Sequence, residues 1–338
     1  MRQAQVLGRI LLVPGEDVIA SHPLQVLTKS SLKPELASVQ SAIIKTIPGG
    51  SKVESFETYR TYLFSIAYRM LGSAMDAEDM VQETYIRYQG AMPETIHSLK
   101  AYLTTILTRL CMDQLGLARR KREQYVGPWL PEPIHTTETT EATDPEKRVE
   151  TQESISLAFL VLLEQLQPFE RAVFLLREVF EYEFAEIAAM LGKSEAASRR
   201  SFSRAKLHLR EHRPRFPASP QIHQQLLSGY LQAVQTGEMT SLTNLLSENV
   251  TLWADGGGKI KQAALRPIIG RDAVARFSMG TKRFWSENSS AELGEANGQP
   301  ALIIHAGNRV FSVLTIDVED GQIQTIRIMA NPDKLAHI

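Results

Sequence analysis

Apolar residues recur at helical spacing over most of the chain between residues 56 and 236. The first such stripe ends at Gly72 and consists of Phe56, Tyr59, Leu63, Ile66, Ala67 and Met70. Residues three and four apart share one face of an α-helix, so this spacing predicts a helix with one buried side. Similar patterns predict helices over 76–88, 97–120, 151–166, 168–180 and 220–236. This part of the chain is therefore expected to be all-α.

Two further helices are predicted between residues 183 and 213, with Gly192 between them. The apolar stripe of the first consists of Phe184, Ile187, Ala188 and Leu191. Ser194 can cap the second helix, whose inward face carries Ser198, Phe202, Ala205 and Leu209. Its outward face carries Glu195, Arg199, Ser203, Lys206 and Arg210. This layout predicts a helix-turn-helix.

The second helix of this unit is strongly basic. From Lys193 to Arg215 the chain has eight Lys or Arg residues against two Glu. These cations can neutralise DNA phosphates, while Arg199, Arg200 and Ser203 can reach base edges in a major groove. A solvated basic helix on an ordinary bundle is the alternative. The glycine between two amphipathic helices, together with this charge asymmetry, favours DNA binding.

The pattern changes after the prolines at positions 214, 217 and 220. A short helix, a helix over 271–284, and β-branched runs at 250–253, 301–304, 310–316 and 323–328 indicate an α+β domain with one curved sheet. Residues 124–150 are rich in Pro and Thr and are predicted to be a linker. Residues 1–52 show no sustained period and are expected to be a poorly ordered N-terminal extension.

Composition limits the class of protein. A length of 338 residues predicts two or three domains, and 43% hydrophobic residues suffice for buried cores. The net charge of −1 means that the basic helix is offset by acidic segments elsewhere. The single cysteine, Cys111, excludes an internal disulfide and fits a reducing cytoplasm, where we expect the protein. No apolar run approaches the roughly 20 residues of a membrane span, so no membrane insertion is expected.

Several separated motifs resemble one known family. The segment from Tyr59 to Thr84 resembles region 2 of a bacterial extracytoplasmic-function sigma factor, a sigma-70 family subunit of RNA polymerase, and 155–212 resembles region 4. Three shorter motifs, Trp129-Leu-Pro-Glu-Pro133, Asp255-Gly-Gly-Gly-Lys259 and Asn331-Pro-Asp-Lys-Leu335, resemble the subgroup with a fused SnoaL-like domain. The resemblance covers about 55–338.

This resemblance implies a multidomain fold of two all-α sigma domains and a C-terminal α+β domain with a cone-shaped sheet. The expected divisions are an N-terminal extension over 1–52, region 2 over 53–123, the linker over 124–150, region 4 over 151–213 and the SnoaL-like domain over 214–338. The implied function is binding of core RNA polymerase, through the β′ clamp and β flap, and recognition of −10 and −35 promoter elements to start transcription.

The resemblance also assigns candidate residues. The expected polymerase-binding residues are Asp76, Glu78, Asp79 and Glu83. The expected −10 residues are His97, Ser98, Lys100, Tyr102, Arg109, Arg119, Arg120 and Arg122, although Tyr102 fits a core position equally well. The expected −35 residues are Ser194, Glu195, Arg199, Arg200, Ser203, Arg204 and Lys206.

The C-terminal domain is expected to be regulatory. Asp255, Asp317 and His305 are the candidates for acid–base chemistry, but they form no convincing pair, and Asp255 before three glycines indicates a hairpin turn. We therefore predict no catalytic residue, cofactor or metal site. The predicted regulatory contacts are Trp129, Leu130 and Pro131 in the linker, Asp255, Gly256, Gly257, Gly258 and Lys259 in the first motif of the domain, and Asn331, Pro332, Asp333, Lys334 and Leu335 in the tail. An unidentified small ligand or protein would then act at this domain.

Two alternatives remain open at this point. A helix-turn-helix regulator that acts without core polymerase would explain 183–213, but not the acidic helix of region 2. A bifunctional protein whose cone-fold domain is a small-molecule isomerase or cyclase would explain the C-terminal domain, and would need a perturbed carboxylate in a deep pocket.

Overall fold

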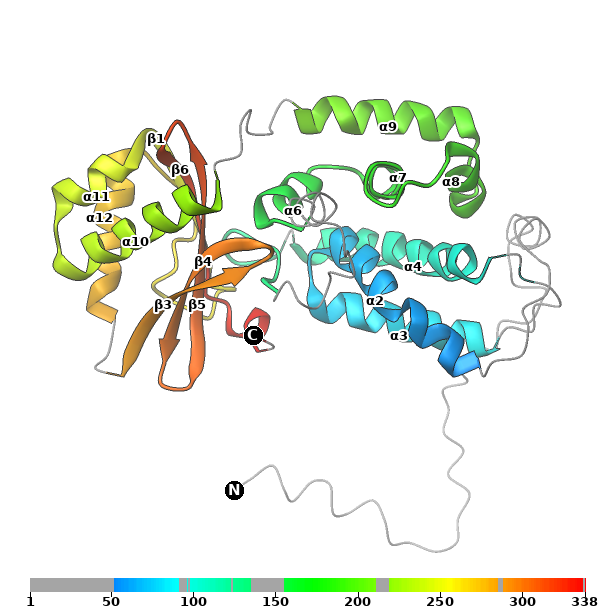
Figure 1. Cartoon of the computed structure of the whole chain (residues 1–338), viewed down its shortest axis with the longest axis horizontal. Coiled ribbons are helices and arrows are strands. Elements are labelled where there is room, and N and C mark those ends of the chain that lie inside the picture. The colour runs from blue at the N-terminus through cyan, green and yellow to red at the C-terminus, as the bar shows by residue number, and fades with distance from the viewer. Residues whose placement is uncertain are drawn as a thin grey trace, which may run out of the picture.

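The computed structural model describes residues 52–90, 96, 98–122, 124–134, 155–210, 219–284, 288–336 and 338. It consists of helices in the first part of the chain and a six-stranded sheet with three helices in the last part (Figure 1). The expectation for 1–52 lies outside the described residues, except for Lys52, which begins the first helix. Residues 135–150 of the predicted linker also lie outside them.

The first helical unit contains α2 (Lys52–Leu71), α3 (Ala74–Gly90) and α4 (Leu99–Arg122). The buried stripe predicted for α2 ends at Gly72, whose φ of 67° is unfavourable for other residues. The α4 helix begins two residues later than predicted, because the Ser98 hydroxyl accepts a hydrogen bond from the Ala101 amide and caps it. The three helices pack pairwise against one another.

The second helical unit contains α6 (Leu157–Leu163), α7 (Pro168–Glu178), α8 (Phe184–Leu191) and α9 (Glu195–Arg210). The α6 helix is shorter than the 151–166 predicted, because Ser156 caps its start and Pro168 begins the next helix. The predicted helix-turn-helix is confirmed in α8 and α9. Gly192 between them has a φ of 64°, and the predicted inward faces are buried except for Phe202, which is half-buried.

The C-terminal domain begins with α10 (Pro220–Thr236) and α11 (Met239–Leu245). Its strands are β1 (Leu246–Asp255), β2 (Ile268–Ile269), β3 (Ser289–Ala296), β4 (Gln299–Ala306), β5 (Arg309–Glu319) and β6 (Gln322–Met329), with α12 (Arg271–Thr281) before β3. The sheet order is β2-β1-β6-β5-β4-β3, and β1 pairs with β6 in parallel. The sequence pattern did not predict β3, because its residues are mostly small or acidic rather than β-branched.

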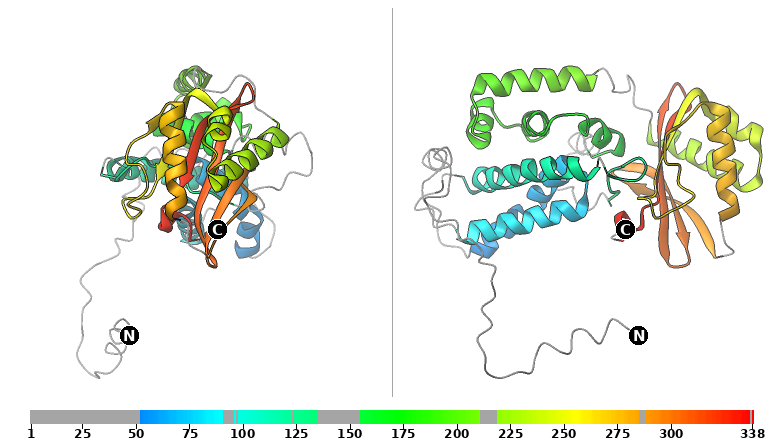
Figure 2. Two further views of the ribbon diagram at one scale, coloured as in Figure 1. Left: turned by 90° about the vertical axis from the view of Figure 1, so that its left-hand side faces the viewer. Right: turned by 180° about the vertical axis from the view of Figure 1, so that it is seen from behind.

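The packing joins units that the sequence presents as separate. One continuous hydrophobic core contains residues of α2, α3 and α4 together with residues of α7, α8 and α9. A second core lies between the sheet and α10, α11 and α12, which cover one face of the sheet. Figure 2 shows that the helical units lie on the opposite side of the sheet. There, Leu130 and Val161 pack with Val313, Met329 and Leu335 in a third, smaller cluster.

Candidate functional site

The centre of the contact between the linker and the sheet is the carboxylate of Asp255. Its side chain has no exposed surface, and it accepts hydrogen bonds from four groups. Oδ1 accepts from the Tyr125 hydroxyl at 2.5 Å and the Gly257 amide at 3.0 Å. Oδ2 accepts from the Leu130 amide and from Lys334 Nζ, each at 2.8 Å. We call Tyr125, Leu130, Asp255, Asn331 and Lys334 the linker clasp.

Lys334 connects the tail of the chain to the linker. Its ammonium donates to the carbonyl oxygen of Leu130 at 2.5 Å and lies 4.1 Å from the centroid of the Trp129 ring. A buried ammonium is costly unless it is paired, and here an ion pair, a carbonyl and an aromatic face surround it. Asn331 completes the clasp by donating to the Tyr125 hydroxyl at 2.9 Å. Burial, followed by the hydrogen bond to Asp255, raises the pKa of Tyr125 well above its ordinary value.

The next linker residues attach to the first helical unit. Glu132 is buried, and its carboxylate accepts hydrogen bonds from the amides of Ala74 and Met75 and from the Ser73 hydroxyl. A carboxylate at this position satisfies amides at the positive end of the α3 dipole. The Tyr68 hydroxyl donates to the Glu132 carbonyl oxygen at 2.6 Å. The linker is thus bonded to α2 and α3 as well as to the sheet.

Asn297 is a buried residue between the units, and the sequence pattern did not predict its contacts. It lies in the β3–β4 turn with a φ of 54° and is completely buried. Its amide group accepts from the Ile134 N–H and donates to the Tyr68 hydroxyl and the Ile155 carbonyl oxygen. One side chain therefore binds the linker, the first helical unit and the start of the second. The sequence feature that points to this position is the Asn297-Gly298 pair, which is typical of a tight hairpin turn.

The remaining predicted regulatory residues lie around the clasp. The sequence predicted a hairpin turn at Asp255, and this prediction is wrong. The strand that ends at Asp255, β1, pairs in parallel with β6, and the glycines after it lead into a loop. An added Cβ at Gly257 would lie 2.4 Å from Asn331 Nδ2, and one at Gly258 would lie 3.0 Å from Val126 Cβ. The glycines thus allow the tail and the linker to approach this loop. At the rim, Lys259 pairs with Asp333 at 2.6 Å.

The other members of the predicted set occupy defined places. A Cβ added to Gly256 would lie 2.5 Å from the Cβ of Ala263. A Cβ added to Gly72 would lie 3.5 Å from the Cβ of Pro131. Leu335 belongs to the small hydrophobic cluster that also contains Leu130 of the linker. Pro332 begins the short 3₁₀ turn Pro332–Lys334, which Asn331 caps. The structure therefore brings together the three short motifs that lie far apart in the sequence.

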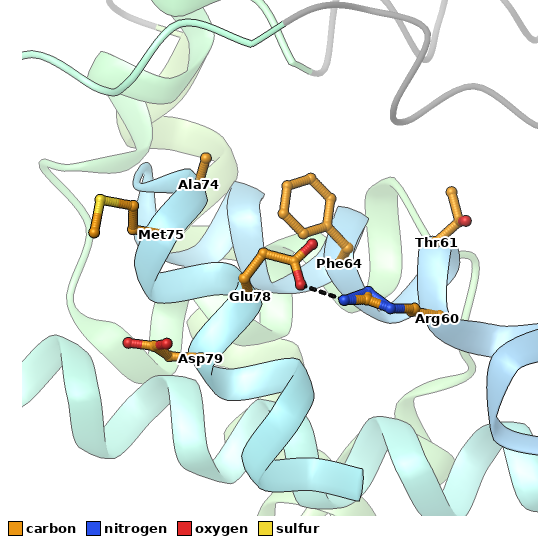
Figure 3. A pocket seen from close by; sticks show the side chains of 7 residues that line it. All are labelled: Arg60, Thr61, Phe64, Ala74, Met75, Glu78 and Asp79. Carbon is orange, nitrogen blue, oxygen red and sulfur yellow. Dashed lines mark hydrogen bonds and ion pairs between the residues drawn. The ribbon is translucent and has the colours of Figure 1, made fainter. Parts of the chain in front are cut away.

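The acidic residues of α3 do not form a single face. Glu78 pairs with Arg60 of α2 at 2.6 Å, whereas Asp79 is exposed and points away from that pair (Figure 3). Asp76 accepts a hydrogen bond from Gln114, and Glu83 pairs with Arg87. A hollow of about 570 Å³ beside this helix is lined by Arg60, Thr61, Phe64, Ala74, Met75, Glu78 and Asp79.

Exposed apolar residues on α3 were not anticipated. Met75 is 58% and Ile86 is 60% exposed, and together with Asp79 and Gln82 they follow the spacing of one helical face. The two apolar side chains lie about three helical turns apart on this face, so they are separate contacts rather than one contiguous apolar patch. Their exposure can be predicted from the sequence, because both residues fall outside the apolar stripe of α3 that contains Ala77, Val81 and Tyr88.

The expected −10 residues are only partly accessible. Tyr102 is buried and packs edge-on against Tyr88, so it is a core residue rather than a stacking platform. Arg109 Nε donates to the carbonyl oxygen of Met190 at 2.8 Å, which ties α4 to α8. Lys100 is exposed and lies over the Tyr62 ring. His97 and the side chains of Arg119, Arg120 and Arg122 lie outside the described residues.

The expected −35 residues are all exposed on α8–α9. Ser194 caps α9 by accepting from the Ala197 amide. Arg199 pairs with Glu195 one turn away and lies 4.6 Å from the Phe184 ring centroid. Arg204 and Lys206 instead pair with Glu170 and Glu178 of α7. These pairs are exposed and therefore weak, so phosphates can displace them.

The candidates for acid–base chemistry are all engaged elsewhere. Asp317 forms a two-point ion pair with Arg327 at 2.6 and 2.7 Å, and His305 lies 3.0 Å from Glu292. Asp255 is bonded within the clasp. Among the described residues, no group of His, Cys, Asp and Glu has the arrangement of a metal site. Cys111 is buried, and burial raises the pKa of its thiol.

Comparison with known proteins agrees with this geometry. The Sigma-70 region 2 model matches residues 55–123 and the Sigma-70, region 4 model matches residues 156–209. The ECF RNA polymerase sigma factor SigJ of Mycobacterium tuberculosis is 35% identical over 294 residues, which are 84% of this chain and 93% of SigJ. The chain belongs to the extracytoplasmic-function sigma factors.

Two further comparisons extend this sigma factor assignment. SigG of the same species is 32% identical over 284 residues, which are 74% of this chain and 72% of SigG. The crystal structure of Mycobacterium tuberculosis SigJ is similar with a TM-score of 0.65 and 33% identity, covering 84% of this chain and 98% of that one. The sigma factor thus combines the two helical sigma regions with a SnoaL-like α+β domain.

As a member of this family, the protein binds RNA polymerase and recognises promoter DNA. The resemblance seen in the sequence is confirmed, including its subgroup with a fused C-terminal domain. The alternative of a helix-turn-helix regulator that acts without core polymerase is therefore not supported. Within the described part of the chain, no helix is long and apolar enough to span a membrane.

The Asn297 turn yields the first prediction. Replacing Asn297 with Ala leaves buried polar groups of Ile134 and Ile155 without partners, at a cost of about 1–3 kcal/mol for each unpaired group. We expect the linker amides near Ile134 to exchange with solvent roughly tenfold faster or more, as measured by hydrogen exchange of the full chain.

The matched control is Asp320→Ala. Asp320 also has a positive φ, of 51°, and also precedes a glycine in a hairpin turn, but it lies in the β5–β6 turn. It carries the same backbone strain without the linker contacts. Equal exchange rates at Ile134 in the two variants would show that Asn297 does not hold the linker.

Proposed function

We propose that the C-terminal domain controls this sigma factor in cis by holding regions 2 and 4 in a closed arrangement. The observation that carries this proposal is the linker clasp. The clasp bonds residues 125–130 to the sheet, while Glu132 bonds the same linker to α3. A linker attached at both sides cannot extend, so the two promoter-reading regions stay together.

The closed arrangement itself rests on direct bonds between the regions. Arg171 of α7 is buried and donates to the Met70 carbonyl oxygen at 2.5 Å. The Tyr62 and Tyr182 hydroxyls bond at 2.9 Å, and Arg109 donates to Met190. Burial lowers the pKa of Arg171 to about 9, which reflects how far its guanidinium is removed from water.

This arrangement does not fit a promoter. The −10 and −35 elements lie about 25 base pairs apart, or roughly 85 Å along B-DNA. The α9 helix packs on α7, and α7 on α4, so α9 and α4 are separated by about two helix layers, or roughly 20 Å. Reading both elements at once therefore requires the regions to separate, and α4 must release Arg109 to offer it to DNA.

The conversion between closed and open forms needs a partner that binds one form better. Core RNA polymerase is one such partner, since it has to bind the separated regions. A second partner at the C-terminal domain can shift the same equilibrium by stabilising or releasing the clasp. The domain then acts as a non-catalytic regulator, in place of a separate anti-sigma protein.

In vitro transcription with purified core polymerase tests this proposal. A chain truncated before Asn331 loses Asn331 and Lys334 and keeps all six strands. We expect its promoter output to rise several-fold at limiting sigma concentration, because Asp255 and the linker lose part of their attachment. Truncation before about residue 217 removes the whole domain and is expected to release the linker as well.

The control is Glu292→Ala, which removes only the surface pair with His305 away from the clasp and should leave output unchanged, because exposed pairs contribute little. If neither truncation raises output relative to this control, the domain does not inhibit in cis.

We further propose that α3 binds the β′ clamp of core polymerase through Met75, Asp79, Gln82 and Ile86, flanked by Asp76, Glu78 and Glu83. Exposed apolar side chains at the two ends of this face can pack against a partner, and the acidic residues beside them suit electrostatic steering. Region 4 would contact the β flap. We also propose that the domain boundaries are those predicted from the sequence and that the protein acts in the cytoplasm.

The polymerase surface is tested by Ile86→Asp. We expect at least tenfold weaker binding to core polymerase in a fluorescence anisotropy titration, because a charge replaces one of the two exposed apolar side chains of the surface. Leu293→Asp is the matched control, since Leu293 is a similarly exposed apolar residue on β3. A similar affinity for both variants would place the polymerase elsewhere.

The −35 surface is proposed to be the outward face of α9, with Arg199 and Arg200 nearest the bases. Arg199→Ala is expected to cost about 1–3 kcal/mol in promoter binding and to relax sequence preference. Gel-shift titrations of the holoenzyme over a salt series measure both effects. Lys206→Ala, a phosphate-type contact, should weaken binding of all sequences evenly and lower the salt slope. An unaltered affinity for Arg199→Ala would contradict this placement.

A further inference from the structure

The C-terminal domain contains a cavity that the contacts described so far do not use. Its volume is about 280 Å³, close to the lower end of the ~300–1,000 Å³ range of small-molecule sites. It lies between the sheet and the helices α10 and α12. Its innermost walls include the buried residues Tyr230, Val234, Ala254, Leu302 and Leu314.

The chemistry of the lining selects the ligand. The sixteen described residues that line the cavity include no Asp, Glu, Lys, Arg or His. Its polar groups are Gln262, Thr281, Ser312 and the Tyr230 hydroxyl, whose pKa burial raises to about 12. A charged ligand would lose its hydration without gaining an ion pair there. The lining therefore suits a neutral, largely apolar molecule with one or two hydrogen-bonding groups.

The same lining disfavours catalysis. Asp255, Asp317 and His305, which are the candidates for acid–base work, do not line the cavity in the described structure. The carboxylate and imidazole groups that most often transfer protons are therefore absent from the described lining, whose one titratable side chain is Tyr230. Binding without turnover is the role that these residues support.

The cavity shares its wall with the linker clasp. Ala254 lines it and directly precedes Asp255, and Ala330 lines it and directly precedes Asn331. The Ala330 amide donates to the Asp255 carbonyl oxygen at 2.8 Å. The loop after Asp255 returns to the cavity through Ile260 and Ala263, and the Ile260 amide donates to the Gly256 carbonyl oxygen.

Close packing makes this shared wall sensitive to occupancy. The Ala263 Cβ lies only 2.5 Å from the position that a Cβ on Gly256 would take, so little space separates the cavity loop from the clasp loop. A ligand that pushes Ile260 or Ala263 outward displaces the backbone that positions Asp255. Packed interiors transmit such shifts because they have few voids.

We infer that this cavity binds a neutral apolar small molecule whose occupancy is coupled to the linker clasp. The inference rests on the proposed cis control, to which it adds the chemical class of the regulatory ligand. Coupling is reciprocal, so a ligand that alters the clasp must bind with altered affinity when the clasp is changed by mutation. This reciprocity gives a test that does not use transcription.

The test is a fluorescence titration of the full chain with phenylnaphthylamine, a neutral apolar fluorophore. We expect saturable binding to the wild type and at least tenfold weaker binding to Phe311→Glu, which places a charge at the cavity rim. Phe311 is 41% exposed, so the substitution does not bury the charge in a core. Ile269→Glu, at an exposed apolar residue on β2, is the matched control and should bind like the wild type.

Two further variants complete the test. Thr281→Trp fills the cavity from α12 and should also abolish binding. Tyr125→Phe lies outside the cavity lining but removes the hydroxyl between Asp255 and Asn331, and should change the probe affinity at least threefold. Circular dichroism spectra of all variants should match the wild type.

Absence of saturable binding to the wild type, or equal loss in Phe311→Glu and Ile269→Glu, would overturn the site. An unchanged affinity in Tyr125→Phe would overturn the coupling. Both outcomes are independent of the proposed cis control, which is judged by promoter output of the truncated chains without any probe.

Discussion

The buried carboxylate of Asp255 is the interaction on which the arrangement of this sigma factor depends. An ionised carboxylate without solvent contact is strongly unfavourable unless donors surround it. Only the Gly257 amide among its four donors belongs to the adjacent loop. The others come from the linker and from the tail of the chain. The carboxylate is therefore satisfied only when the linker and the tail are docked together.

This dependence makes the linker a structural element of the folded protein. Residues 124–134 contain no helix or strand, yet their backbone and side chains bond to α2, α3, the β3–β4 turn and the tail. The hydrogen-bonding groups of an irregular segment have to find partners outside it. Here those partners belong to two different units, the first helical unit and the C-terminal domain, so a change in one unit can reach the other through the linker.

The sequence predicted most of the helices because their apolar stripes are regular. It also predicted that the three short motifs act together, but only through resemblance to a family. It missed Asn297, since a single Asn-Gly pair indicates a turn and says nothing about what that turn contacts. It left Tyr102 undecided between core and surface, because helical spacing places a residue on a face without stating what covers the face.

The sequence by itself determined the local structure and the chemical character of each surface. The glycine at position 192, the basic face of α9 and the acidic start of α3 all follow from residue order and helical geometry. Tertiary structure alone decided that regions 2 and 4 share one core, that Arg109 is bonded to α8, and that Asp255 faces a lysine 79 residues away. These features depend on contacts between segments that are distant in the chain. A local pattern of residues does not specify which distant segment will pack against it.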